Sequence, residues 1–152
     1  MKQEERKMKV LIATEGSEFS DAAIREFSRI FGPADNVVVK VLAAVEPATV
    51  PAEPFAVSAE YIQQLDDAGR KHASDVAERA AAEINSRCPS ADDVLTKVVV
   101  GSPEQAIVSE AEDWGADLIV TGSHGRGFWK RALLGSVSSA VVHHAPCSVL
   151  IV

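Results

Sequence analysis

The sequence has few cysteines and aromatic residues, and it has no long apolar run. Its two cysteines, Cys88 and Cys147, are far apart and form no CxxC pair, so we expect neither a disulfide framework nor a zinc site. No segment approaches the roughly 18 apolar residues of a membrane span. No signal-peptide core follows the charged stretch from Met1 to Lys9. We therefore expect a cytoplasmic protein that is not attached to a membrane.

Basic residues are also in short supply. The 152 residues include 15 Lys and Arg against 22 Asp and Glu, which gives a net charge of −7. Binding to nucleic acid or to an anionic membrane needs a basic face, so neither partner is expected. Acidic residues are missing in turn from Leu118 to Val152, where Arg126, Lys130 and Arg131 cluster. This local loss of negative charge favours an anionic ligand near that segment.

Short apolar runs alternate with helical patterns along the chain. The length suits one domain, which we place at residues 9–152 after a charged N-terminal extension, 1–8. The pattern predicts an α/β fold with an open five-stranded parallel sheet, helices on both faces, and the Rossmann-like strand order 3-2-1-4-5. The expected strands are 9–13, 37–45, 94–100, 117–121 and 147–152. In such sheets, ligands bind beyond the carboxyl ends of the strands.

A long helix is expected from Ala59 to Arg87, after a loop that contains Pro47, Pro51 and Pro54. Apolar and small residues recur along one face of this helix, which predicts that the whole face is buried. That face comprises Ile62, Leu65, Gly69, Val76, Ala80 and Ile84. A shorter helix is expected from Ser136 to His144, with Ser136 as its N-cap.

A glycine-rich segment follows the predicted fourth strand. It reads Gly122-Ser123-His124-Gly125-Arg126-Gly127, and a spacer of nine residues separates Gly125 from Gly135-Ser136. Glycines allow the main chain to approach a ligand and to present successive N–H groups, and a helix N-terminus adds partial positive charge. Both features suit a phosphate. The spacing is neither the Rossmann GxGxxG nor a Walker P-loop, and glycines that only turn the chain are the alternative.

With these residues in view, the sequence resembles the ATP-binding branch of the universal stress protein family. The resemblance is carried by Gly122 to Gly125, the nine-residue spacer and Gly135-Ser136, by the opening Val10 to Ser17, and by the ending Ala145 to Val152. It implies phosphate binding by the glycine segment and the start of the next helix, contacts to ribose and adenine at the end of the first strand, and main-chain contacts to adenine from the second. The implied nucleotide-binding residues are Ala13, Thr14, Glu15, Leu42, Gly122, Ser123, His124, Gly125, Arg126, Gly127, Gly135, Ser136, Val137 and Ser138.

Glu15 departs from the family pattern, which usually has Asp at this position. A carboxylate here would bind a ribose hydroxyl or help to hold Mg²⁺, and the extra methylene of Glu changes its reach. The expected ligand is therefore ATP, with or without Mg²⁺, and Glu15 is the one candidate metal contact.

The function that this resemblance implies is that of an ATP-binding regulatory protein of the stress response, acting as a nucleotide-dependent switch. The alternative is a nucleotide-dependent enzyme, either a slow ATPase with autophosphorylation or an adenylyl transferase. No Walker lysine and no residue to position an attacking water is evident, so no catalytic residue is assigned. The apolar C-terminal strand, 147–152, predicts a homodimer because an exposed edge of this kind favours pairing with a second copy.

Overall fold

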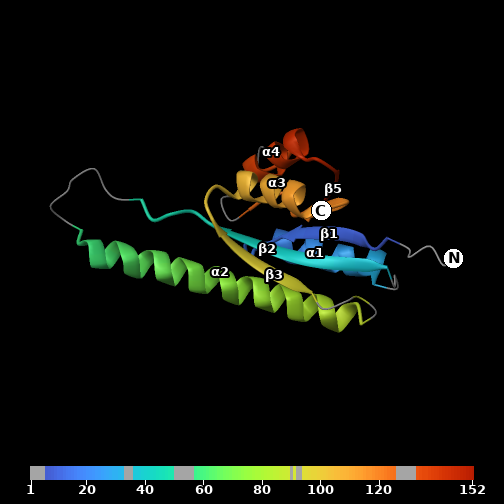
Figure 1. Ribbon diagram of the computed structural model, residues 1–152, viewed down its shortest axis with the longest axis horizontal. Coiled ribbons are helices and arrows are strands. Elements are labelled where there is room, and N and C mark those ends of the chain that lie inside the picture. The colour runs from blue at the N-terminus through green and yellow to red at the C-terminus, as the bar shows by residue number, and fades with distance from the viewer. Residues whose placement is uncertain (1–5, 33–35, 50–56, 90, 92–93, 126–132) are drawn as a thin grey trace.

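The computed structural model describes residues 6–32, 36–49, 57–89, 91, 94–125 and 133–152. Five strands and four helices alternate along the described chain (Figure 1). They are β1 (Met8–Ala13), α1 (Glu18–Phe31), β2 (Val37–Val45), α2 (Ala59–Arg87), β3 (Leu95–Val100), α3 (Pro103–Trp114), β4 (Leu118–Thr121), α4 (Ser136–His144) and β5 (Ser148–Ile151). All neighbouring strands pair in parallel, in the order β3-β2-β1-β4-β5. The predicted fold class and strand order are confirmed.

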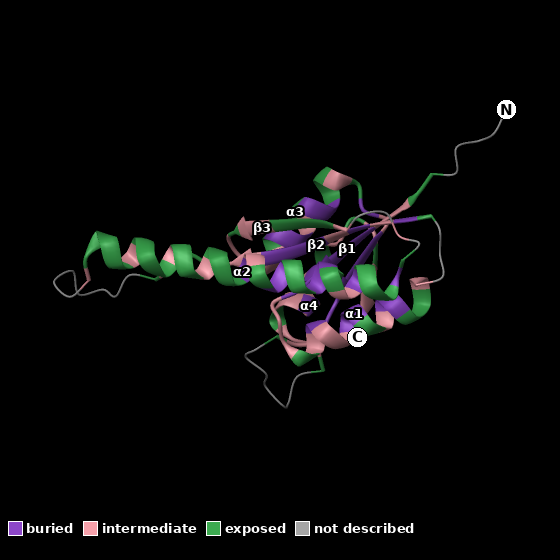
Figure 2. Cartoon of the chain, turned by 90° about the horizontal axis from the view of Figure 1, so that it is seen from below, coloured by how far each residue is buried: buried purple, intermediate pink, exposed green. Residues whose placement is uncertain are grey.

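The central strand β1 is buried on both faces of the sheet. Val10, Leu11 and Ile12 are fully inaccessible to solvent, as expected for a parallel strand covered by helices on each side (Figure 2). Val10 and Ile12 belong to the core beneath α1 and α2, whereas Leu11 belongs to the core beneath α3 and α4. Alternate residues of one strand thus supply two separate cores.

Only part of α2 follows the prediction. Val76, Ala80 and Ile84 are buried, but Leu65 is 45% exposed and Ile62 is only half-buried. The helix has 29 residues, about 43 Å at ~1.5 Å per residue. The nine residues of β2 extend only about 30 Å, so roughly the first third of α2 runs beyond the sheet (Figure 1). Despite this length, neither α2 nor any other described helix is apolar enough to cross a membrane.

The helix starts are fixed in different ways. Ser17 caps α1, because its hydroxyl accepts a hydrogen bond from the Ser20 N–H, and Gly16 precedes it with a φ of 77°. In α4 the N-cap is Gly135, not Ser136 as predicted. Gly135 has no side chain to cap the helix, so the first main-chain N–H groups of α4 are left for another acceptor.

Candidate functional site

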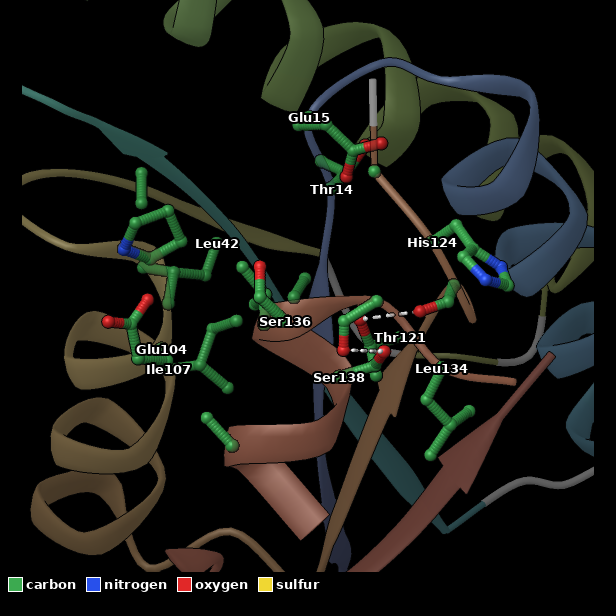
Figure 3. Close-up of a pocket in the computed structure, with 18 of the residues that line it drawn as sticks. Thr14, Glu15, Leu42, Glu104, Ile107, Thr121, His124, Leu134, Ser136 and Ser138 are labelled. Carbon is green, nitrogen blue, oxygen red and sulfur yellow. Dashed lines mark hydrogen bonds between the residues drawn. The ribbon is translucent and has the colours of Figure 1, made fainter. Parts of the chain in front are cut away.

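A cavity of about 690 Å³ opens at the carboxyl ends of the strands, a size typical of small-molecule sites (Figure 3). Segments that follow four different strands line it, together with the first turns of α3 and α4. The lining residues are Ala13, Thr14, Glu15, Leu42, Ala44, Glu46, Pro103, Glu104, Ile107, Thr121, Gly122, His124, Gly125, Leu134, Gly135, Ser136, Val137, Ser138 and Ala140. The cavity therefore lies where open parallel sheets bind ligands.

Thr14 holds the turn after β1 in place. Its N–H donates to the Leu42 carbonyl at 3.0 Å. Its buried hydroxyl accepts from the Gly16 N–H and donates to Ser20 Oγ, both at 3.2 Å. Because these bonds occupy the hydroxyl, Thr14 shapes the wall of the cavity and fixes the position of the next residue, Glu15.

Glu15 brings an unsatisfied acceptor to this wall. Its Oε1 atom is buried and has no hydrogen-bond partner among the described residues. The side chain lies at the cavity, above Ser136 in the view of Figure 3. A buried carboxylate oxygen without a donor costs free energy, so its position favours a ligand that brings a hydroxyl or a cation.

The glycines of the loop after β4 differ in what surrounds them. A Cβ added to Gly122 would lie 2.7 Å from the main chain of Phe19, so packing against the start of α1 requires this glycine. A Cβ on Gly135 would lie 3.2 Å from His124 Cα, which is also a close contact. A Cβ on Gly125 would meet no atom of the described part of the chain within 4 Å. Gly125 also has no positive φ, so neither packing nor backbone conformation explains a glycine there.

The main chain of Ser123 closes the loop onto α4. Its carbonyl accepts hydrogen bonds from the Gly135 N–H and from Ser138 Oγ, both at 2.7 Å. Ser123 itself does not line the cavity, unlike the other described residues of the predicted site. The Ser138 hydroxyl is occupied within the loop, so Ser138 can offer a ligand its main chain only.

The start of α4 brings main-chain N–H groups without helical acceptors to the cavity. The Ser139 N–H donates to the Gly135 carbonyl and begins the helical ladder, so the N–H groups of Ser136, Val137 and Ser138 precede it. These three residues line the cavity. Such N–H groups, at the positive end of a helix, suit an anion.

His124 lies on the same side of the cavity as Thr121 and Leu134 (Figure 3). The glycines belong to this side too, since Gly125 follows His124 directly and a Cβ on Gly135 would lie against His124 Cα. Its ring is 5.3 Å from the Phe19 ring, and its Nδ1 lies 3.1 Å from Ser123 Oγ. The predicted contacts Arg126 and Gly127, and the basic residues Lys130 and Arg131, fall outside the described residues.

The opposite end of the cavity contains residues that sequence reasoning did not single out. Ala44 and Glu46 come from the end of β2, and Glu104 and Ile107 from the first turns of α3. The sequence did place these segments near the carboxyl ends of strands, where a ligand was expected. It did not indicate which of their side chains would line the cavity. Leu42 lies here as predicted, but its carbonyl is bonded to Thr14, so it offers a side-chain surface.

The described residues supply no cage for a metal ion. They contain no group of three or more His, Cys, Asp or Glu side chains close enough to coordinate one. Magnesium bound with a nucleotide needs only one or two carboxylates beside the phosphate oxygens. The unpartnered carboxylate of Glu15 fits that limited role.

The family model "Universal stress protein family" matches residues 8–152 of this chain. The chain belongs to the universal stress protein family. Universal stress protein A homolog 2 of Coxiella burnetii is 51% identical over 55 residues, which cover 36% of this chain and 37% of that protein. The match to this curated relative thus spans little more than a third of its length.

Solved universal stress protein structures extend the similarity to the whole fold. UspA from Lactobacillus plantarum has a TM-score of 0.80 and 26% identity, covering 97% of this chain and 98% of its own. A universal stress protein in complex with cAMP has a TM-score of 0.64 and 30% identity, covering 95% and 96%. The parallel sheet and its helices are therefore shared with these universal stress proteins.

Proposed function

We propose that the cavity binds an adenine nucleotide, ATP in particular, and that the protein is a stress-response regulator that acts as a nucleotide-dependent switch. The observation that carries the proposal is Gly125. It lines the cavity, and neither packing against the described residues nor backbone conformation requires a glycine there. A glycine at such a position is accounted for by a ligand that needs the space a side chain would fill.

The two ends of the cavity suit the two ends of a nucleotide. Gly122, Gly125 and the start of α4 provide main-chain N–H groups for phosphate oxygens. Glu15 provides an acceptor for a ribose hydroxyl, or a contact for a phosphate-bound Mg²⁺. Leu42 and Ile107 provide an apolar surface for a base. The related structure with cAMP, an adenine nucleotide, supports this ligand class.

A switch needs a connection between the ligand and the rest of the molecule. The loop after β4 is bonded to the end of the chain, since the Ser123 N–H donates to the Val152 carbonyl at 2.7 Å. The Val152 N–H donates in turn to the Thr121 carbonyl at 3.1 Å. Movement of the loop around phosphates would therefore act directly on the end of β5.

The edge strand β5 is the proposed dimer contact. Among the described residues it pairs with β4 on one side only, and Val149, Leu150 and Ile151 remain partly exposed. Pairing of residues 147–152 with the same segment of a second copy would cover this edge with two-fold symmetry. We place the dimer in the cytoplasm, in keeping with the sequence.

Co-purification tests the proposal most simply. The protein is purified without added nucleotide and denatured, and the released small molecules are identified by mass spectrometry. In parallel, ATP affinity is measured for the nucleotide-free protein and for Gly125→Val. We expect ATP or another adenine nucleotide in the wild type, and at least about tenfold weaker ATP binding in the variant, a loss of about 1.4 kcal/mol.

The matched control is Ala68→Val, which adds a similar volume at an exposed position of α2 outside the cavity. It should leave ATP affinity unchanged. Unchanged ATP affinity in Gly125→Val would refute the assignment of phosphates to this loop.

A further inference from the structure

The cavity is chemically asymmetric in a way that the glycine loop does not explain. His124, Leu134 and Thr121 lie on one side of it, and Leu42, Ile107 and Glu104 lie on the other (Figure 3). If the phosphates occupy the glycine side, the base occupies the side of Leu42 and Ile107. A carboxylate, Glu104, therefore shares the base end with the apolar side chains.

Glu104 lies at the start of a helix and carries a negative charge. It belongs to the first turn of α3, directly after Pro103, which fits the first position of a helix. The side chain is neither fully buried nor fully exposed. The nearby Ser102 hydroxyl, and then its own main-chain N–H, lower the pKa of Glu104 below its usual value. An ionised carboxylate only accepts hydrogen bonds, so the base end carries an acceptor that cannot become a donor near neutral pH.

We propose that Glu104 selects the base, by accepting a hydrogen bond from the exocyclic amino group of a 6-aminopurine and disfavouring a purine with a carbonyl oxygen at that position. The inference rests on the proposed function and adds a specificity-determining residue to it. The acceptor can satisfy an N–H donor but repels a second acceptor such as the 6-oxo group of hypoxanthine. Adenine is thereby preferred through a side chain of α3.

The other two carboxylates at the cavity are less suited to this role. Glu46 is exposed, so water screens its charge and competes for its hydrogen bonds. Glu15 follows β1 and lies above Ser136, away from Ile107 (Figure 3). Glu104 is the carboxylate that α3 holds beside the apolar surface.

The experiment compares the affinities of ATP and ITP for the nucleotide-free, full-length protein by calorimetry. ITP differs in having a carbonyl oxygen in place of the 6-amino group and a proton on N1. The wild type should bind ATP at least about tenfold more tightly than ITP, the effect of one hydrogen bond to a charged group. In Glu104→Gln the preference should fall to within about threefold, since an amide can either accept or donate.

Glu112→Gln is the matched control, because Glu112 is an exposed residue of the same helix that does not line this cavity. It should keep the wild-type preference for ATP. Thermal unfolding without ligand checks that each variant is folded. Glu104→Ala replaces the glutamine variant if that one unfolds, and it should lose the preference by weakening ATP.

Two outcomes would overturn the inference while leaving the proposed function intact. One is a wild type that binds ITP as tightly as ATP, and the other is an ATP preference that survives in both Glu104 variants. In the second case, main-chain groups would select the base instead. Absence of saturable binding of any nucleotide to the wild type would be a different result, because it would refute the proposed function itself.

Discussion

At the scale of single residues, the glycines after β4 separate into one that packing requires and one that we assign to the proposed ligand. Gly122 is required by the main chain of Phe19, 2.7 Å from the place of a Cβ, whereas Gly125 faces open space. Sequence spacing treats the two alike, because a glycine looks the same whether a neighbour or a ligand excludes its side chain. Substitution by alanine distinguishes them.

We expect Gly122→Ala to lower the free energy of unfolding by about 1–3 kcal/mol, the usual cost of overpacking. Gly125→Ala should change it by less than about 0.5 kcal/mol, as at an unconstrained surface position. Urea unfolding of both variants without ligand is the measurement. Equal stability of the two would show that the approach of α1 does not require Gly122.

Replacing Glu15 should have opposite effects on the stability of the free protein and on its affinity for the ligand. Glu15→Gln removes a negative charge whose Oε1 atom is buried without a partner. The free protein should therefore unfold at an equal or higher temperature, while ATP affinity should fall about tenfold through loss of a charge-assisted hydrogen bond. Thermal unfolding with and without ATP measures both effects.

The comparison variant for this prediction is Glu18→Gln, an exposed residue of α1. It should leave the stabilisation by ATP unchanged. If Glu15→Gln bound ATP as the wild type does, Glu15 would have no part in holding the ligand.

Much of the site was predictable one residue at a time. Ala13, Glu15, Leu42, Gly125 and His124 all line the cavity, as the motif and the strand ends indicated. Ser123 does not, because its carbonyl faces the start of α4 and closes the loop. Glu104 was missed because its place in the cavity lining follows from the packing of α3 beside β2. The sequence around Glu104 does not indicate that β2 lies beside α3.

At the scale of elements, α3 makes a buried ionic contact that its sequence pattern did not reveal. Glu110 is only 5% exposed although its side chain is charged. Lys40 of β2 donates to it at 2.7 Å, and Lys97 of β3 also forms an ion pair with it. Lys40 lies over the Trp114 ring as well, 4.3 Å from its centre. The group ties α3 to two strands.

The pH dependence of stability should report this group. Burial of the carboxylate raises the pKa of Glu110, but the hydrogen bonds and charges of Lys40 and Lys97 outweigh burial and leave the pKa below its usual 4.5. The stabilisation is therefore complete above pH 4.5 and is lost as the pH falls through the lower folded-state pKa. We expect Glu110→Gln to cost about 3 kcal/mol at pH 7, because it leaves the largely enclosed Lys40, whose side chain is 14% exposed, without its counter-charge.

Denaturant unfolding from pH 7 to pH 3 tests this prediction. The difference in the free energy of unfolding between the wild type and Glu110→Gln should become smaller as the pH falls. Glu83→Gln breaks the more exposed pair with Arg87 and should cost at most about 1 kcal/mol at any pH. A difference in the free energy of unfolding for Glu110→Gln that stays constant across the pH range would contradict stabilisation by the ion pairs of Glu110.

The elements themselves were predictable because the apolar periodicity and the glycine and proline residues between the periodic segments indicate the same boundaries along most of the chain. The strands and helices end within about two residues of the predicted limits, as expected for boundaries that fray. The exception is the burial of α2, whose apolar periodicity continues through Ile62 and Leu65 although no strand lies beneath them. Periodicity indicates which face of a helix is apolar, but it does not indicate how far the sheet extends along that face.

At the scale of the whole molecule, the two edges of the sheet should behave differently. β5 is the proposed dimer edge, whereas β3 at the opposite edge carries the exposed residues Leu95 and Lys97. We expect a dimer by light scattering at micromolar concentration. Val149→Lys should shift it toward monomer, because lysine on an edge strand opposes pairing.

Leu95→Lys places the same charge on the other edge and should leave the dimer intact. A wild-type monomer, or a dimer lost only with Leu95→Lys, would contradict the assignment to β5.

The most direct test of the nucleotide site is an ATP titration followed through the main-chain amide signals of the ¹⁵N-labelled protein. The account predicts saturable shifts at Gly125, Ser136, Val137 and Ser138, with the amides around Ile84 in α2 unmoved. Absence of shifts at millimolar ATP, or shifts confined to α2, would contradict it.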